Sequence, residues 1–239
     1  MSINSSIQSL YWIDSDDNAV FPPVELALTE PDGLLAFGAN LSVPRLLEAY
    51  ELGIFPWYSE GQPIMWWSPN PRAVLFPEQL KISRSLAKTL RKGIFNVTFD
   101  TAFEAVIHAC SQPRESQAET WITDEMLAAY CQLHEAGHAH SVECWCDGEL
   151  VGGLYGVAIG RVFFGESMFA RRSDASKVAI VTLTKQLIEW GFQLIDCQVQ
   201  SDHLDSLGAT SLPREKFTQL LERWCKVEPI NQPNQGKWR

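Results

Sequence analysis

The sequence predicts a mixed α/β protein, with a small N-terminal part followed by a larger part built around a sheet. Nearly half of its 239 residues are hydrophobic, which is enough for a substantial core. Helical and strand-like patterns alternate along the chain. Three consecutive β-rich segments, then a helix and one more strand, fall between residues 139 and 199. Helices packed around a mixed sheet account for this order.

The N-terminal part is punctuated by turn residues. Residues 1–40 contain Pro22-Pro23 and Pro31-Asp-Gly33, so we expect loops and short strands there. Ser42 can cap a helix that continues through Tyr50. Four prolines exclude a long helix from the connector at 55–72. We therefore expect a domain boundary near this connector, with a small N-terminal domain at 1–72 and a larger domain at 73–239.

The larger part has helix caps, glycines and turn residues that mark the limits of its elements. Ser83 and Gly93 bound one helix. Asp147-Gly148 is a strong hairpin signal, and Gly191 ends the helix before the last strand. The expected helices are 83–92, 101–111, 123–136, 176–190 and 213–224, and the expected strands are 74–76, 95–99, 139–146, 150–159, 162–169 and 193–199.

Composition limits the class of protein. A net charge of −10 argues against a general nucleic-acid binder, so any RNA contact must be a local basic patch. No apolar run approaches the ~20 residues needed to span a bilayer. The first residues lack the features of a signal peptide, and the six scattered cysteines are expected to be reduced thiols. We expect a cytoplasmic protein.

Two apolar, strand-like segments carry polar groups where a core strand would have hydrocarbon. The first contains Glu166, and the second contains Asp196 and Gln198. Residues two apart on a strand point the same way, so Asp196 and Gln198 are expected to share a face. A buried carboxylate is costly unless it is paired or used. The three residues indicate either a reactive site or a structural hydrogen-bond network, and the residues alone leave both open.

A basic stripe interrupts this acidic chain. Arg84, Lys88 and Arg91 lie on one face of the helix at 83–92, with Lys81 and Lys92 close by and no acidic residue between 81 and 92. Phosphates are attracted to such a stripe, although a solvated helix face would have the same pattern. A weaker basic cluster, Arg171, Arg172 and Lys177, lies beside the start of the helix at 176–190.

Aromatic and apolar side chains suggest a binding surface. Four of the nine tryptophans, Trp57, Trp66, Trp67 and Trp121, lie in or near the connector and loops, where they could stack on nucleobases or pack between domains. Ile180, Leu183 and Leu187 share one helix face, which should meet the strands that carry Met168 and Ile195. Such a face is ordinarily core.

Three other functions are disfavoured. His134-Glu-Ala-Gly-His138 has the spacing of a zinc peptidase motif, but Gly137 is expected to end the helix between the histidines, so we expect no metal site. An acyl-CoA-dependent N-acyltransferase needs a glycine-rich loop for the pyrophosphate, and the corresponding segment, 170–176, has no glycine. A non-catalytic RNA-binding module would leave Glu166, Asp196 and Gln198 without a purpose.

Five motifs in fixed order carry a resemblance to a known family. They are Gly53-Ile-Phe-Pro-Trp57, Trp66-Trp-Ser-Pro-Asn-Pro-Arg72, Thr120-Trp-Ile-Thr123, Val162-Phe-Phe-Gly-Glu-Ser-Met-Phe169 and Leu194-Ile-Asp-Cys-Gln-Val199. The chain resembles the leucyl/phenylalanyl-tRNA–protein transferases from about Leu34 to Arg214. The resemblance implies an acyl-CoA N-acetyltransferase-like fold for the larger domain, which the expected order of elements also suits. It implies transfer of leucine or phenylalanine from aminoacyl-tRNA to proteins that begin with Arg or Lys, which marks them for degradation.

The resemblance also assigns roles to residues. Asp196, assisted by Gln198, would polarise the incoming amine, and proton transfer through the tRNA 2′-hydroxyl is the alternative. Glu166 would hold the acceptor's basic side chain or support the site. No metal or organic cofactor is implied. The substrate-binding residues would be Trp57 and Trp121 against the terminal adenosine, together with Tyr50, Leu154, Met168, Ile180, Leu183, Leu187 and Ile195, and the tRNA-binding residues would be Arg84, Lys88 and Arg91.

Overall fold

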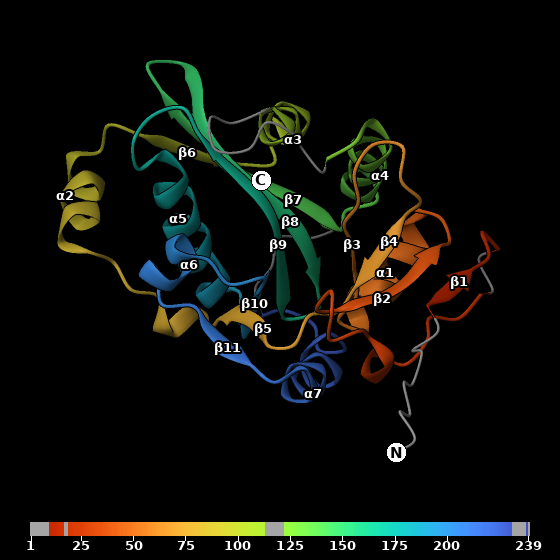
Figure 1. Ribbon diagram of the computed structural model, residues 1–239. Helices are drawn as coiled ribbons and strands as arrows, with labels where there is room; N and C mark the ends of the chain where they lie inside the picture. Colours follow the sequence, from red (N-terminus) through yellow and green to blue (C-terminus); the bar gives the residue numbers. More distant parts are fainter. Residues whose placement is uncertain (1–9, 17–18, 113–121, 231–237, 239) are drawn as a thin grey trace.

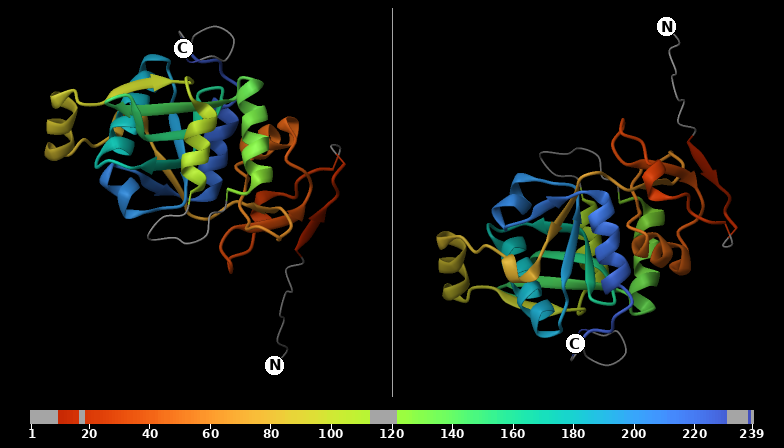
Figure 2. Two further views of the ribbon diagram at one scale, coloured as in Figure 1. Left: turned by 90° about the horizontal axis from the view of Figure 1, so that it is seen from above. Right: turned by 90° about the horizontal axis from the view of Figure 1, so that it is seen from below.

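Two sheets organise the chain. The computed structural model describes residues 10–16, 19–112, 122–230 and 238 (Figure 1). One sheet has four strands and the other has seven. The small sheet lies beside one end of the large sheet, and helix α2 projects at the opposite end (Figures 1 and 2). The predicted mixed α/β class is confirmed.

The N-terminal part contains the small sheet and one helix. Its strands, in sheet order, are β1 (Tyr11–Ile13), β2 (Leu34–Gly38), β4 (Met65–Trp67) and β3 (Phe55–Pro56). Helix α1 (Val43–Glu51) begins at Ser42, whose hydroxyl accepts the backbone N–H of Arg45, as the sequence predicts. The connector contains two short strands, β3 and β4, which its sequence does not predict.

The large sheet contains an antiparallel meander of three long strands. In sheet order its strands are β11 (Thr210–Leu212), β5 (Arg72–Leu75), β10 (Leu194–Gln198), β9 (Val162–Ala170), β8 (Glu149–Ile159), β7 (Ala139–Cys146) and β6 (Asn96–Phe99). Asp147 and Gly148 both have positive φ, 53° and 82°, as a tight β7–β8 hairpin requires. β10 is parallel to β9 and antiparallel to β5.

Helices cover both faces of the large sheet. They are α2 (Arg84–Lys92), α3 (Phe103–Ser111), α4 (Asp124–Glu135), α5 (Ala175–Glu189), α6 (Asp202–Ser206) and α7 (Arg214–Trp224), with short 3₁₀ turns at Val24–Leu26 and Pro77–Gln79. One hydrophobic cluster joins α5 to the sheet, and a second joins α1, α3, α4 and α7 to its other face. Among the described residues, no helix has both the length and the apolar character to cross a membrane.

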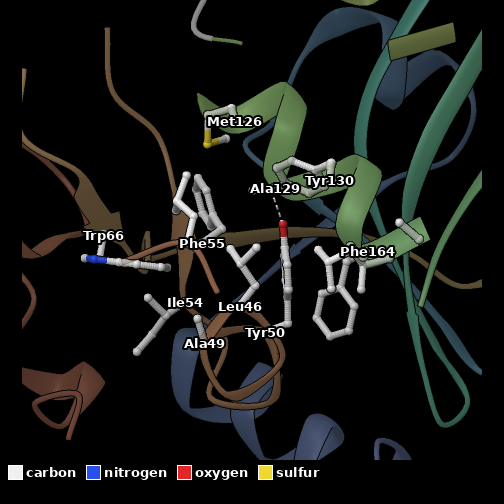
Figure 3. Close-up of a cluster of buried hydrophobic side chains, with 14 of the residues drawn as sticks. Leu46, Ala49, Tyr50, Ile54, Phe55, Trp66, Met126, Ala129, Tyr130 and Phe164 are labelled. Carbon is white, nitrogen blue, oxygen red and sulfur yellow. Dashed lines mark hydrogen bonds between the residues drawn. The ribbon is translucent and has the colours of Figure 1, made fainter. Parts of the chain in front are cut away.

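The second cluster continues into the small sheet. Figure 3 shows Tyr50 of α1 and Phe55 of the connector close to Tyr130 of α4 and Phe164 of β9. Trp66 is fully buried in the same cluster. The small and large sheets therefore share one hydrophobic core. The domain boundary expected between residues 72 and 73 remains a prediction.

Candidate active site

The site forms where two parallel strands separate. β9 and β10 pair at three positions, from Val162–Leu194 to Phe164–Asp196, and the paired positions end there. Both strands are irregular just beyond this point. Tyr155 and Gly156 of β8 lie opposite Ser167 and Gly165, so Glu166 is an extra residue in β9.

β10 has a corresponding irregularity beside its partner β5. Asp196 pairs with Val74 and Gln198 pairs with Ala73, so Cys197 has no opposite residue on β5. Gln198 also adopts a positive φ of 54°, which strands ordinarily do not. The two strands therefore diverge at the segments that contain Glu166, Asp196 and Gln198.

A pocket of about 930 Å³ lies where β9 and β10 separate. Tyr155 and Ala109 in its lining belong to the cluster under α3 and α4, whereas other lining residues belong to the cluster under α5, so the pocket reaches both faces of the sheet. Leu154, Met168, Ile180 and Ile195 form what we call the apolar wall.

Only some of the side chains predicted to bind the aminoacyl group line the pocket. All four residues of the apolar wall line the pocket. Leu183 and Leu187 are fully buried in the core beneath α5 and are not among the residues that line it. They belong to the same hydrophobic cluster as Leu154, Ile180 and Ile195.

Asp196 is held in a buried ion pair. Its Oδ1 accepts a hydrogen bond from Nε of Arg72 at 2.8 Å, and its Oδ2 accepts one from Nη2 of the same guanidinium at 2.7 Å. The side chains are 0% and 1% exposed, respectively. The guanidinium carbon also lies 4.7 Å from the ring centroids of both Phe55 and Phe217. This two-point contact fixes the orientation of the Asp196 carboxylate.

Glu166 is the second carboxylate of the site. Its Oε1 accepts the hydroxyl of Tyr50 at 2.7 Å and the side-chain amide of Gln198 at 3.1 Å, and its Oε2 accepts the hydroxyl of Tyr130 at 2.9 Å. Burial raises the pKa of Glu166 to about 7, while the two tyrosine hydroxyls act in the opposite direction. Glu166 can therefore change its protonation state near neutral pH.

Gln198 connects the two carboxylates. Its backbone N–H donates to Oδ1 of Asp196 at 3.0 Å, and its side chain donates to Glu166. The predicted link between Asp196 and Gln198 is present, but it runs through the backbone amide of Gln198. The side-chain amide is used on Glu166.

The predicted tryptophans occupy different environments. Trp57 is 42% exposed and packs at 5.6 Å against Trp67, which leaves much of its side chain accessible for stacking. Trp66 is buried, packs edge-on against Phe21 and donates its indole N–H to the carbonyl oxygen of Gly38, so its role is core packing. Trp121 lies outside the described residues.

The predicted basic stripe is solvent-exposed. Arg84, Lys88 and Arg91, which we call the α2 basic face, are all exposed on α2. The hydroxyl of Thr89 donates to Asp174 at 2.9 Å, which ties α2 to the residue that precedes α5. Ser176 in the first turn of α5 lines the pocket. The α2 basic face is thus attached to the end of α5 that borders the pocket.

Three residues near the site were not predicted from the sequence as parts of it: Arg72, Tyr130 and His203. Arg72 was noted only within a motif, although a buried Asp196 implies a cationic partner. His203 lines the pocket, and its buried Nε2 has no hydrogen-bond partner among the described residues. Burial, followed by repulsion from Lys177, lowers its pKa. The helix that carries it, α6, has only five residues and gives no clear periodic signal.

The described part of the chain contains no group of three or more His, Cys, Asp or Glu side chains suited to a metal ion. Gly137, with φ of 83°, follows the end of α4 and separates His134 from His138, as predicted. The His134 ring stacks on Phe103 at 4.2 Å, and its Nδ1 lies 2.7 Å from the Ala139 carbonyl oxygen. The zinc-peptidase spacing does not form a zinc-peptidase site.

Comparison with known proteins identifies the family. Residues 74–222 match the model of the leucyl/phenylalanyl-tRNA protein transferases, and residues 39–70 match the model of the N-terminal domain of the same family. The chain belongs to this family. It is 57% identical over 224 residues to the leucyl/phenylalanyl-tRNA–protein transferase of Nitrosospira multiformis, covering 90% of this chain and 96% of that protein. It is 57% identical over 230 residues to that of Pseudomonas putida, covering 96% and 99%.

The solved structures with some similarity to this aminoacyltransferase are more distant. A GCN5-related N-acetyltransferase from Kribbella flavida has a TM-score of 0.37 and 16% identity, covering 69% of this chain and 58% of that chain. L-PGS from Bacillus licheniformis has a TM-score of 0.39 and 9% identity, covering 79% and 58%.

Proposed function

We propose that this protein transfers leucine or phenylalanine from aminoacyl-tRNA to the α-amino group of proteins that begin with Arg or Lys, in the cytoplasm, and so marks them for degradation. The observation that carries this proposal is the pocket between β9 and β10, in a member of this transferase family. The pocket combines the apolar wall with the linked Glu166, Gln198 and Asp196.

The donor contacts follow from the positions of the candidate residues. The leucyl or phenylalanyl side chain would lie against the apolar wall, where Met168 can adapt to either shape. Trp57, together with Trp121, would stack on the terminal adenosine. The α2 basic face would contact tRNA phosphates.

The reaction needs positioning and removal of a proton. The aminoacyl ester is already activated, but the incoming α-amine is cationic at neutral pH and must become neutral before it attacks. In this proposal Asp196, fixed by Arg72, acts with Gln198 to polarise the amine, and the Asp196 carboxylate stabilises the positive charge that develops on the attacking nitrogen. Tyr50 is fully buried and donates to Glu166, so it would act through that carboxylate.

A transfer assay tests the proposed function. Radiolabelled leucyl-tRNA is incubated with the protein and a peptide that begins with Arg, and label in the peptide is measured. We expect label in the Arg-initiated peptide, none in the same peptide with an acetylated N-terminus, and none from labelled acetyl-CoA. Absence of transfer from leucyl-tRNA, or transfer from acetyl-CoA, would contradict the proposal.

A further inference from the structure

Two tyrosines from different helices converge on Glu166. Tyr50 belongs to α1 and Tyr130 belongs to α4, and Figure 3 shows their hydroxyl ends facing one another in the core beside Phe164. Their hydroxyl oxygens also lie in close contact with each other. Each donates to a different oxygen of the Glu166 carboxylate. Both side chains are fully buried, so they hold this position through packing.

The two charged groups that act on Glu166 are paired with each other. The titratable and charged groups that act on Glu166 are Tyr50, Tyr130 and Tyr155 from α1, α4 and β8, and Asp196 and Arg72 from β10 and β5. Asp196 and Arg72 form a closed pair. Burial is the largest cause that raises the pKa of Tyr50 and Tyr130 well above their usual value, so both remain neutral donors.

We infer that Glu166 accepts the proton of the incoming amine, and that Tyr50 and Tyr130 are positioning residues that keep Glu166 ionised and aimed into the pocket. This inference rests on the proposed function. Glu166 lines the pocket and is partly accessible from it. Asp196 is the weaker candidate as acceptor, because it is 0% exposed and paired with the Arg72 cation, whereas the donors that bind Glu166 are neutral.

The protons balance over one cycle. One proton moves from the acceptor's α-ammonium nitrogen to an oxygen of Glu166. The neutral amine then attacks the ester carbonyl carbon, and a C–N bond replaces the C–O bond to the ribose. A second proton leaves that nitrogen and goes to the ribose oxygen, which departs as the free hydroxyl of the tRNA. Glu166 returns its proton to solvent before the next cycle.

The pH dependence of transfer tests the roles of the tyrosines. A base acts in its ionised form, so activity should rise with pH through the pKa of Glu166, near neutral pH. Removing one hydroxyl in Tyr50→Phe or Tyr130→Phe removes a donor to the anion and should raise that pKa. The acidic limb of kcat/KM should therefore move about one pH unit higher in each variant. Tyr58→Phe is the matched control, because its hydroxyl donates to Glu125 at 2.9 Å, and its limb should not move.

A second readout is independent of transfer. Infrared difference spectroscopy of the tRNA-free protein follows the protonation of Glu166, and Glu166→Gln identifies its band. The titration should shift upward in Tyr50→Phe and Tyr130→Phe, with thermal melting confirming that each variant is folded. An unshifted titration in the folded variants would overturn the inference whether or not transfer is observed. A shifted titration without any transfer by the wild-type protein would support the positioning role of the tyrosines and contradict the proposed function.

Discussion

Replacing Asp196 with alanine should have two effects with different causes: a loss of stability and a loss of turnover. The variant leaves the Arg72 guanidinium buried without its carboxylate, since the two side chains are 1% and 0% exposed and joined by two hydrogen bonds of 2.7 and 2.8 Å. Breaking a buried pair by removing one partner costs about 3–5 kcal/mol. For a chain of this length, that corresponds to a fall in Tm of about 6–20 °C.

The pair should show strong coupling in a double-mutant cycle. Arg72→Met alone leaves a buried carboxylate, and the double variant Arg72→Met, Asp196→Ala removes both charges. The loss of unfolding free energy in the double variant should be smaller than the sum of the single losses by about 0.5–3 kcal/mol. Asp147→Asn is the control, because Asp147 and its partner Arg172 are 90% and 47% exposed, so losing this contact should change stability by about 0–1 kcal/mol.

Turnover is measured below the melting range of each variant. If Asp196 assists the attack of the amine, single-turnover transfer from leucyl-tRNA should fall by about 10²–10⁴ in Asp196→Ala, and Gln198→Ala should fall in the same direction. Their combined effect should be much less than multiplicative, because the two residues are linked. A folded Asp196→Ala protein with near-normal turnover would refute a catalytic role. Additive losses in the stability cycle would refute the ion-pair argument.

Three further predictions concern the donor. Replacing all three residues of the α2 basic face with Glu should weaken transfer from aminoacyl-tRNA and lower the salt dependence of that transfer. Transfer from an aminoacyl-adenosine analogue without the acceptor stem should be affected much less. Equal losses with both donors would rule out contact with tRNA phosphates. Trp57→Ala should raise the KM for the donor, by an amount equivalent to a loss of about 1–3 kcal/mol of binding free energy. Normal binding of a puromycin-like analogue by the folded variant would show that Trp57 is structural. The apolar wall should accept leucine and phenylalanine and reject lysine and aspartate, so efficient transfer of either charged residue in a competition assay would contradict it.

Much of the fold follows from local sequence signals. The α2 helix runs from Arg84 to Lys92, with Ser83 as its N-cap and Gly93 in the left-handed conformation, as the sequence predicts. The long strands of the meander were predicted within about one residue of their limits, because their composition and turns are distinctive. The short elements β1, β3, β4, β11 and α6 were not predicted individually, because three to five residues, or fewer, give little periodicity.

The site was only partly predictable. Glu166, Asp196 and Gln198 were identified because polar groups interrupt apolar strands, and the structure joins them in one network. The partners of these residues come from distant segments: Arg72 precedes Asp196 by 124 residues, and Tyr50 precedes Glu166 by 116. Local periodicity carries no information about such pairs. The irregularities that separate β9 from β10 depend on strand register, which appears only when the sheet is assembled.

A crystal structure of the protein with a non-hydrolysable leucyl-adenosine analogue would show directly where the aminoacyl group binds. We expect the leucyl side chain to lie against Leu154, Met168, Ile180 and Ile195, with the carbonyl carbon beside Glu166 and Gln198 where β9 and β10 separate. An analogue bound elsewhere, with this pocket unoccupied, would contradict the assignment of the site.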